Sequence, residues 1–170
     1  EEREAPAYDE AAVQRAQKLA QKKPFSGCPG MRAKQFQRST APAAGAACPS
    51  QLSQWPVQIK LAGVMAPYFD DVDLLIAADC TAYAYGNFHE KFIRGRITLI
   101  GCPKLDAVDY AEKLTAIFAA HSIRSVTVAR MEVPCCGGIE QAVQRAIAAS
   151  GKAISCHVTV IGTDGTIQEE

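Results

Sequence analysis

The chain has 170 residues, 48% of them hydrophobic, and its 18 Lys and Arg side chains balance 18 Asp and Glu side chains. This composition supplies one principal domain with a substantial core, and its zero net charge gives no electrostatic argument for binding nucleic acid or an anionic membrane. No apolar run in the sequence is long enough to span a bilayer, and none has the form of a signal peptide, so we expect a soluble, cytoplasmic protein.

The N-terminal part of the chain, residues 1–53, forms a separate region in this interpretation. Residues 9–23 predict a helix, because apolar side chains recur at helical spacing ahead of a proline. A turn-rich loop that contains Cys28 follows, and residues 33–53 show no periodicity, which is typical of a linker. Since the chain begins at Glu1 without an initiator methionine, we expect it to be a piece of a longer protein.

Strand-like and helix-like segments alternate over residues 54–170. This pattern predicts an α/β domain, a three-layer sandwich whose mostly parallel sheet of about five strands carries helices on both faces. The predicted strands are residues 57–62, 73–78, 96–100, 125–133 and 154–161. The predicted helices are residues 82–93 (broken at a glycine), 106–121 (capped by Asp106) and 137–150 (closed by Gly151). A final turn at residues 163–166 allows an antiparallel edge strand to follow.

Four of the seven cysteines stand where predicted strands end. They are Cys80, Cys102, Cys135 and Cys136. In an open parallel sheet the carboxyl ends of the strands share one edge, where ligands bind, so we expect these thiols to meet in one crevice. Thiolates gathered in this way suit a soft metal ion or an iron–sulfur cluster.

The segment Pro134-Cys-Cys-Gly-Gly138 is the strongest single motif. Two adjacent cysteines do not both fill a core, because consecutive side chains point in different directions. Its glycines allow backbone to approach a bulky group, and a helix that begins at Gly137 would stabilise an anion or lower the pKa of a thiol. Cys102 lies in a Gly-Cys-Pro-Lys turn in which Lys104 favours a thiolate, and Cys28 repeats the Gly-Cys-Pro pattern.

The other candidate residues have ordinary interpretations beside the functional ones. A lone strand-end cysteine such as Cys80 is often a small buried hydrophobe. Cys48 lies in a low-complexity stretch and is interpreted as incidental, and Cys156 is expected in the core or on a half-buried face of the last strand. His89 is a candidate ligand, proton donor or base, or simply a surface residue. Asp79 either tunes a nearby proton or cluster, or caps the next helix.

Three functions remain open from these residues. An odd cysteine number without a signal peptide argues against a disulfide scaffold, and the sequence contains neither a Cys-x-x-Cys pair nor a Gly-x-Gly-x-x-Gly motif. The first hypothesis is an iron–sulfur redox protein. The second is a metal-free enzyme with Cys135 or Cys136 as nucleophile and His89 or Asp79 as base. The third is a zinc-stabilised binding module, which the missing close cysteine pairs weaken.

Six ordered motifs carry a family resemblance. They are Trp55-Pro-Val-Gln-Ile-Lys60, Ala66-Pro-Tyr-Phe69, Asp73-Leu-Leu-Ile-Ala-Ala-Asp-Cys80, Tyr85-Gly-Asn-Phe-His89, Gly101-Cys-Pro-Lys-Leu-Asp106 and Met131-Glu-Val-Pro-Cys-Cys-Gly-Gly138. Over about residues 1–32 and 54–150 the chain resembles the C-terminal domain of iron–sulfur proteins of anaerobic microbes, which are described as 4Fe-4S-binding or ferredoxin-like proteins.

This resemblance implies an iron–sulfur cofactor, with [4Fe-4S] the first expectation. It also implies a preceding ferredoxin module that is lost or encoded elsewhere, and that module or another redox protein would exchange electrons with this chain. With Cys28 the candidate ligands outnumber the four thiolates of a cubane cluster. Either one cysteine is spare, or the adjacent pair supports a non-cubane or larger cluster. An oxidoreductase activity and an oligomeric assembly are both compatible with this expectation.

Overall fold

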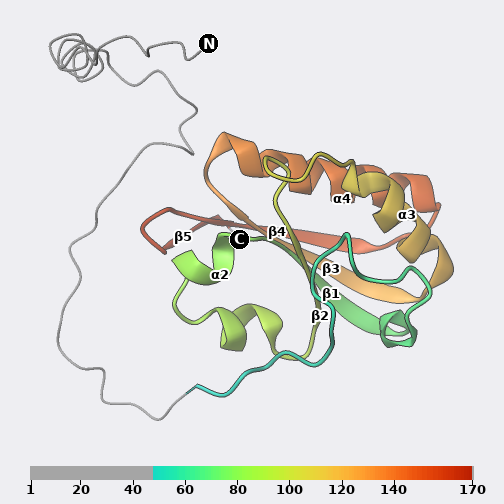
Figure 1. Cartoon of the computed structure of the whole chain (residues 1–170), viewed down its shortest axis with the longest axis horizontal. Coiled ribbons are helices and arrows are strands. Elements are labelled where there is room, and N and C mark those ends of the chain that lie inside the picture. The colour runs from blue at the N-terminus through green and yellow to red at the C-terminus, as the bar shows by residue number, and fades with distance from the viewer. Residues whose placement is uncertain (1–47, 170) are drawn as a thin grey trace, which may run out of the picture. The chain divides into compact units, whose positions relative to one another are not determined.

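A five-stranded sheet forms the centre of the computed structural model, which describes residues 48–169 (Figure 1). The strands are β1 Val72–Ala78, β2 Ile97–Gly101, β3 Ile123–Met131, β4 Ser155–Ile161 and β5 Ile167–Glu169. Their order across the sheet is β2-β1-β3-β4-β5, with parallel pairing from β2 to β4 and antiparallel pairing of β5 with β4. The predicted mostly parallel sheet and its antiparallel edge strand are confirmed. The predicted helix at residues 9–23 and the Cys28 loop lie outside the described residues.

Helices cover both faces of the sheet, as the three-layer prediction requires. The longer helices, α3 Tyr110–Ala120 and α4 Gly137–Ser150, lie side by side on one face (Figure 1). The other face carries the short helix α2 Thr81–Ala84 and the π-helix η3 His89–Ile93. Two 3₁₀ turns, η2 Pro67–Phe69 and η4 Pro134–Cys136, complete the helical elements of residues 48–169.

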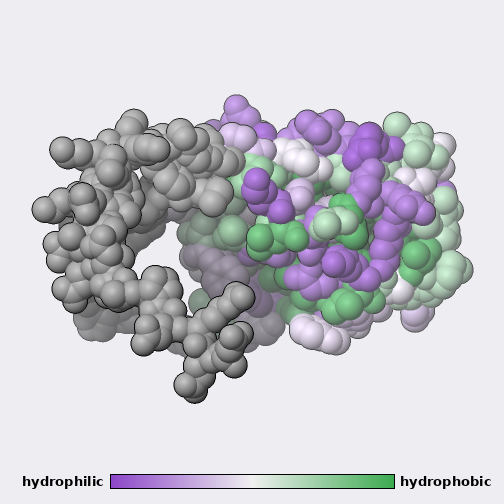
Figure 2. All heavy atoms as spheres, turned by 45° about the horizontal axis from the view of Figure 1, so that its top comes forward, coloured by the Kyte–Doolittle hydropathy of each residue, from purple (hydrophilic) through white to green (hydrophobic). Residues whose placement is uncertain are grey.

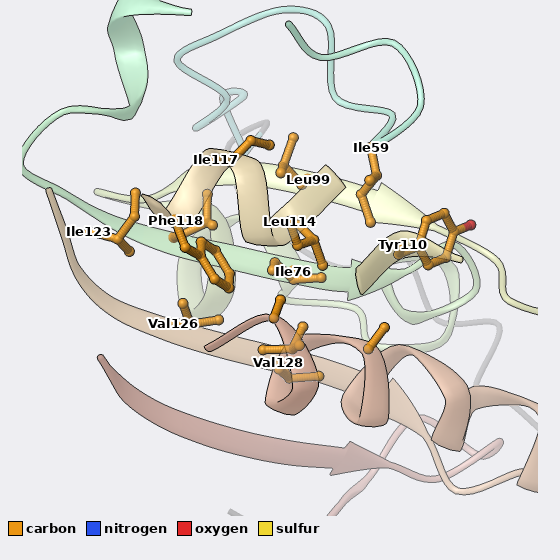
Figure 3. Close-up of a cluster of buried hydrophobic side chains, with 14 of the residues drawn as sticks. Ile59, Ile76, Leu99, Tyr110, Leu114, Ile117, Phe118, Ile123, Val126 and Val128 are labelled. Atoms are coloured by element: carbon orange, nitrogen blue, oxygen red, sulfur yellow. The ribbon is translucent and has the colours of Figure 1, made fainter. Parts of the chain in front are cut away.

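Two hydrophobic cores lie on opposite faces of the sheet. Figure 3 shows the larger core, in which Leu114 and Phe118 of α3 pack over Ile76 of β1. On the opposite face Leu75 and Phe92 belong to the second core, under α2 and η3. Because successive side chains of a strand point to opposite faces, burial on both sides explains why β1 is a continuous apolar run in the sequence.

The predicted strand at residues 57–62 is wrong. Only Gln58 forms a β-bridge, with Ile100 of β2. The backbone turns directly afterwards, since the N–H groups of Leu61 and Ala62 both donate to the Gln58 carbonyl, at 2.9 and 3.0 Å. Ile59 and Ala62 are nevertheless almost fully buried in the larger core. The apolar run therefore predicted correctly that these side chains are buried. It predicted wrongly that the backbone is extended.

Two helix boundaries also differ from the prediction. The helix expected at 82–93 is two short elements, α2 and η3, separated by residues 85–88 rather than interrupted at one glycine. Helix α3 begins at Tyr110, and its cap is Asp109, whose Oδ1 accepts the Ala111 N–H at 2.9 Å. Asp106 instead accepts a hydrogen bond from the Tyr110 hydroxyl at 2.5 Å. Helix α4 ends at Gly151 in the left-handed conformation, as predicted.

The exposed apolar side chains are scattered rather than continuous. Trp55, Tyr83 and Leu105 are the most exposed of them among the described residues, and Figure 2 shows separate hydrophobic patches between hydrophilic ones on the face toward the viewer. Singly exposed apolar residues are normal for a folded domain. Within residues 48–169 no helix is long and apolar enough to cross a membrane.

Candidate cysteine site at the carboxyl edge of the sheet

The four strand-end cysteines lie at the same edge of the sheet. Cys80 follows β1 by two residues, Cys102 follows β2 directly, and Cys135 and Cys136 lie in η4 after β3. These three strands are neighbours in the sheet. Across the sheet, β2 lies on one side of β1, whereas β3 and then β4 lie on the other side. The direction in which successive strands are added therefore reverses between β1 and β3. In sheets of this kind ligands bind at the point of reversal.

The thiols are close enough for their charges to interact. The Cys80 thiolate is affected electrostatically by Cys102 and Cys135, and that of Cys136 by Cys135 and Cys80. Their exposure is graded, since Cys136 is buried, Cys102 and Cys135 are half-buried, and Cys80 is exposed. Side chains from three separate strand ends therefore form one group that is accessible from solvent at Cys80.

Short backbone turns fix the position of each cysteine. The Cys80 carbonyl accepts the Ala84 N–H at 3.0 Å, within the first turn of α2. The Cys102 carbonyl accepts the N–H groups of Leu105 and Asp106, at 3.1 and 2.9 Å. The Cys136 N–H donates to Val133 at 3.0 Å. These turns hold the backbone on which the cysteine side chains are placed.

Glycines bring two of these loops into contact. A Cβ atom placed on Gly138 would lie 3.1 Å from the Cβ of Pro103, so the first turn of α4 packs tightly against the residue after Cys102. A Cβ on Gly137 would have nothing within 4 Å. The prediction that the glycine pair admits a close approach therefore applies to Gly138.

Burial controls the protonation of these thiols. It raises the pKa of Cys136 to about 11, with a further rise from the neighbouring thiols and an opposing effect of the Met131 backbone. Burial also raises the pKa of Cys80, and Cys102, Asp79 and Cys135 add to the shift. The lowered thiol pKa expected from the start of α4 is therefore not found at Cys136, where desolvation outweighs the helix dipole. A bound cation would have to displace the protons that these raised pKa values favour on Cys80 and Cys136.

Two carboxylates lie close to the cysteines. Burial and the nearby Asp106 raise the pKa of Asp79, against a smaller effect of the Gln58 side chain. The buried Oδ1 of Asp79 has no hydrogen-bond partner among the described residues. Burial and Asp106 also raise the pKa of Tyr110, whose hydroxyl lies where a side chain on Gly101 would be. Sequence reasoning missed Asp106 and Tyr110 as neighbours of the site, although their i, i+4 spacing was a usable signal.

Several other candidates lie elsewhere. His89 Nδ1 accepts the Gln51 N–H at 3.1 Å, and with Cys48 it lines a separate pocket of about 320 Å³. No interaction within residues 48–169 joins His89 to Cys80. Lys104 is exposed. Cys156 is half-buried against the larger core, as predicted.

The sulfur donors at this edge come from three separate loops. Within residues 48–169 no three His, Cys, Asp or Glu side chains are arranged to hold one metal ion. A tetrahedral zinc site requires such a compact group. An iron–sulfur cluster interposes its own irons and sulfides, so its thiolate ligands stand further apart. The four thiols of this edge are donors of the kind that such a cluster takes.

The fold and this edge define a doubly wound α/β domain whose switch point is rich in thiols. The chain belongs to the Rossmann-like domain family, whose sequence profile matches residues 66–170. A protein of Archaeoglobus fulgidus, described as uncharacterized, is 28% identical over 118 residues, which cover 69% of this chain and 84% of that protein. No solved structure matches the chain.

Proposed function

We propose that this chain is an iron–sulfur cluster-binding redox protein that transfers electrons. Cys80, Cys102, Cys135 and Cys136 would hold the cluster at the carboxyl edge of the sheet, with Cys28 a further candidate outside the described residues. The observation that carries the proposal is the gathering of four thiols from three neighbouring strand ends at the point where the strand order reverses. The resemblance to the C-terminal domain of 4Fe-4S-binding proteins supports the same cofactor.

The bound cluster would supply one-electron redox chemistry. The chain's own residues would hold it in place and limit its contact with water. The contact between Gly138 and Pro103 fixes the distance between the Cys102 loop and the adjacent pair. Helix α4 begins immediately after Cys136 and directs the positive end of its dipole toward this edge, which favours thiolates and a negatively charged cluster.

The exposed position of Cys80 supports electron exchange with a partner. A ligand at the protein surface shortens the path to an incoming redox centre, while the buried Cys136 anchors the opposite side of the group. We propose a ferredoxin module, or another redox protein of the cytoplasm, as the partner. The cofactor is proposed to be [4Fe-4S], or a non-cubane or larger cluster if both adjacent cysteines bind it.

Single cysteine variants of the full chain test this proposal. Protein purified without oxygen should show visible absorption and, after reduction, an electron paramagnetic resonance signal. Cys80→Ser and Cys102→Ser should lose most of both signals and of the bound iron. Cys156→Ser, in the same sheet but on the core side, should retain them. Unchanged iron and spectra in the first two variants would exclude these residues as ligands and overturn the proposed site.

The same variants distinguish the two other functions. A metal-free cysteine enzyme would depend on one thiol that reacts with an alkylating reagent at neutral pH, and losing Cys80 or Cys102 would leave that reaction intact. The raised pKa of Cys136 disfavours that residue as the nucleophile, because an activated thiol has a lowered pKa. A zinc-stabilised module would be colourless and contain one zinc per chain.

A further inference from the structure

The face of the sheet that carries α2 and η3 becomes polar toward the amino ends of its strands. In register across the sheet, Asp73 of β1 lies opposite Ser125 of β3, which lies opposite Ser155 of β4. One step further along, Thr127 lies opposite His157. Among the described residues, α2, η3 and the turn η4 are the helical elements on this face, and they pack on its apolar carboxyl half. The polar half is therefore left open.

A pocket of about 210 Å³ lies where η3 meets this polar half. Its lining residues are Lys91, Phe92, Arg96, Thr127, His157 and Thr159. Two of them are cationic, one is an imidazole and two carry hydroxyl groups, and within the described residues no carboxylate lines the pocket. Pockets for drug-sized molecules start at roughly 300 Å³. The size and the charge of this pocket together favour a small anion.

Arg96 is held in place for such a role. One of its guanidinium nitrogens, Nη1, donates to the carbonyls of Lys91 and Phe92, at 3.2 and 3.0 Å. Within residues 48–169 its Nε and Nη2 groups donate to no protein acceptor. An arginine that is already oriented loses less side-chain entropy on binding, and its planar donors match the oxygens of an oxyanion.

The nearest carboxylate does not neutralise Arg96 by direct pairing. Asp73 influences Arg96 electrostatically, but its oxygens accept hydrogen bonds from Arg124 Nη2 and from the Ser125 hydroxyl, both at 2.7 Å. No ion pair of Arg96 is formed within the described residues. The Arg96 guanidinium therefore keeps donors for a ligand.

We propose that this pocket, the η3–β4 pocket, binds a tetrahedral oxyanion of the size of phosphate, either free or as the phosphoryl end of a small phosphate monoester. Arg96 would offset part of its charge, and the hydroxyls of Thr127 and Thr159 would donate to its oxygens. Thr159 is 3% exposed, so its hydroxyl is reached from inside the pocket rather than from open solvent. This site uses none of the cysteines and does not rest on the proposed cluster.

Calorimetric titration of the full chain with sodium phosphate, at constant ionic strength, tests the site. Saturable binding is expected, and Arg96→Gln should weaken it by about tenfold or more because a charge-assisted contact is lost. Arg94→Gln is the matched control, since it removes the same charge two residues away, from a side chain paired with Glu90 at 2.7 Å and outside the pocket. It should leave the affinity unchanged.

A second variant keeps the test independent of folding effects. Arg96 also holds η3, so Thr127→Val, which removes one hydroxyl at nearly constant volume, should weaken binding by about threefold to tenfold. Competition by glycerol 3-phosphate would identify a phosphate monoester as a ligand, and binding of phosphate alone would identify the free ion. Two results overturn the proposal: titrations of the unaltered chain without saturable binding, or equal weakening in Arg94→Gln and Arg96→Gln.

Discussion

Gly137 and Gly138 are adjacent in sequence but differ in surroundings. Both lie at the start of α4, yet only Gly138 faces another loop closely, at Pro103. The sequence predicts that a glycine here allows a close approach, but it does not show which of the two does so. The residue that approaches, Pro103, follows a strand that is distant in the sequence. The same holds for Asp106 and Tyr110, whose contact with the cysteine edge depends on how β2 and α3 pack.

We expect Gly138→Ala to destabilise the site and Gly137→Ala to stabilise the helix. The Gly138 Cβ would push on Pro103 from 3.1 Å, at a cost of about 1–3 kcal/mol, which offsets the helix propensity gained with alanine. Gly137→Ala should gain up to about 1 kcal/mol, because its Cβ meets open space. Thermal unfolding and iron content measure both effects. Equal stability and equal iron content in the two variants would contradict the tight contact.

Asp73 predicts a dependence of stability on pH in acid. Hydrogen bonds from Arg124 and Ser125 lower its pKa below the ordinary value of 3.8. The resulting stabilisation is present above pH 3.8 and is lost as the pH falls through the folded-state pKa. In Asp73→Asn the free energy of unfolding should therefore fall less steeply below pH 4 than in the unaltered chain. Glu112→Gln, at an exposed position of α3, is the control and should keep the original slope.

At the scale of elements, the hydrophobic pattern located the parallel strands of the sheet. The four parallel strands lie within two residues of the predicted ones. The pattern failed at residues 57–62, where a turn buries the apolar side chains. It failed again at 82–93, because Phe88 and Phe92 are buried at helical spacing although the segment 85–88 interrupts the helix. Periodicity reports which side chains are buried, and the backbone path between them depends on tertiary contacts.

Segment 54–59 covers the edge of β2 without forming a strand. The side chain of Gln54 accepts the Thr98 N–H at 3.3 Å and donates to the Thr98 carbonyl, and Ile100 is bonded to Val57 and Ile59 through backbone. An uncovered strand edge offers its backbone groups to other chains. The segment therefore protects β2 from pairing between molecules.

Gln54→Ala should reduce stability by about 1–2 kcal/mol and increase association, because Thr98 loses both partners. Chemical denaturation measures the first effect and light scattering the second. Gln51→Ala is the control, since the Gln51 side chain bonds only to the nearby Pro49 carbonyl among the described residues, at 3.4 Å. If both variants behave alike, the edge is covered by something other than Gln54.

At the scale of the molecule, topology decides which thiols meet. The sequence predicts that strand ends share an edge, but it does not specify which strands are neighbours. The order β2-β1-β3 places the loops with Cys80, Cys102 and the adjacent pair next to one another. Had β2 formed at the far side of β4, Cys102 would have been separated from the others. The shared edge of these cysteines was therefore predictable from sequence, and which of them are neighbours depended on strand order.

The central claim is that these thiols hold an iron–sulfur cluster. The measurement that tests it most directly is iron and acid-labile sulfide per chain, in the 170-residue chain purified without oxygen. We predict about four irons and about four sulfides, and a higher count would indicate the larger cluster that two adjacent cysteines allow. Protein that contains neither iron nor sulfide, even after reconstitution with both, would contradict the claim.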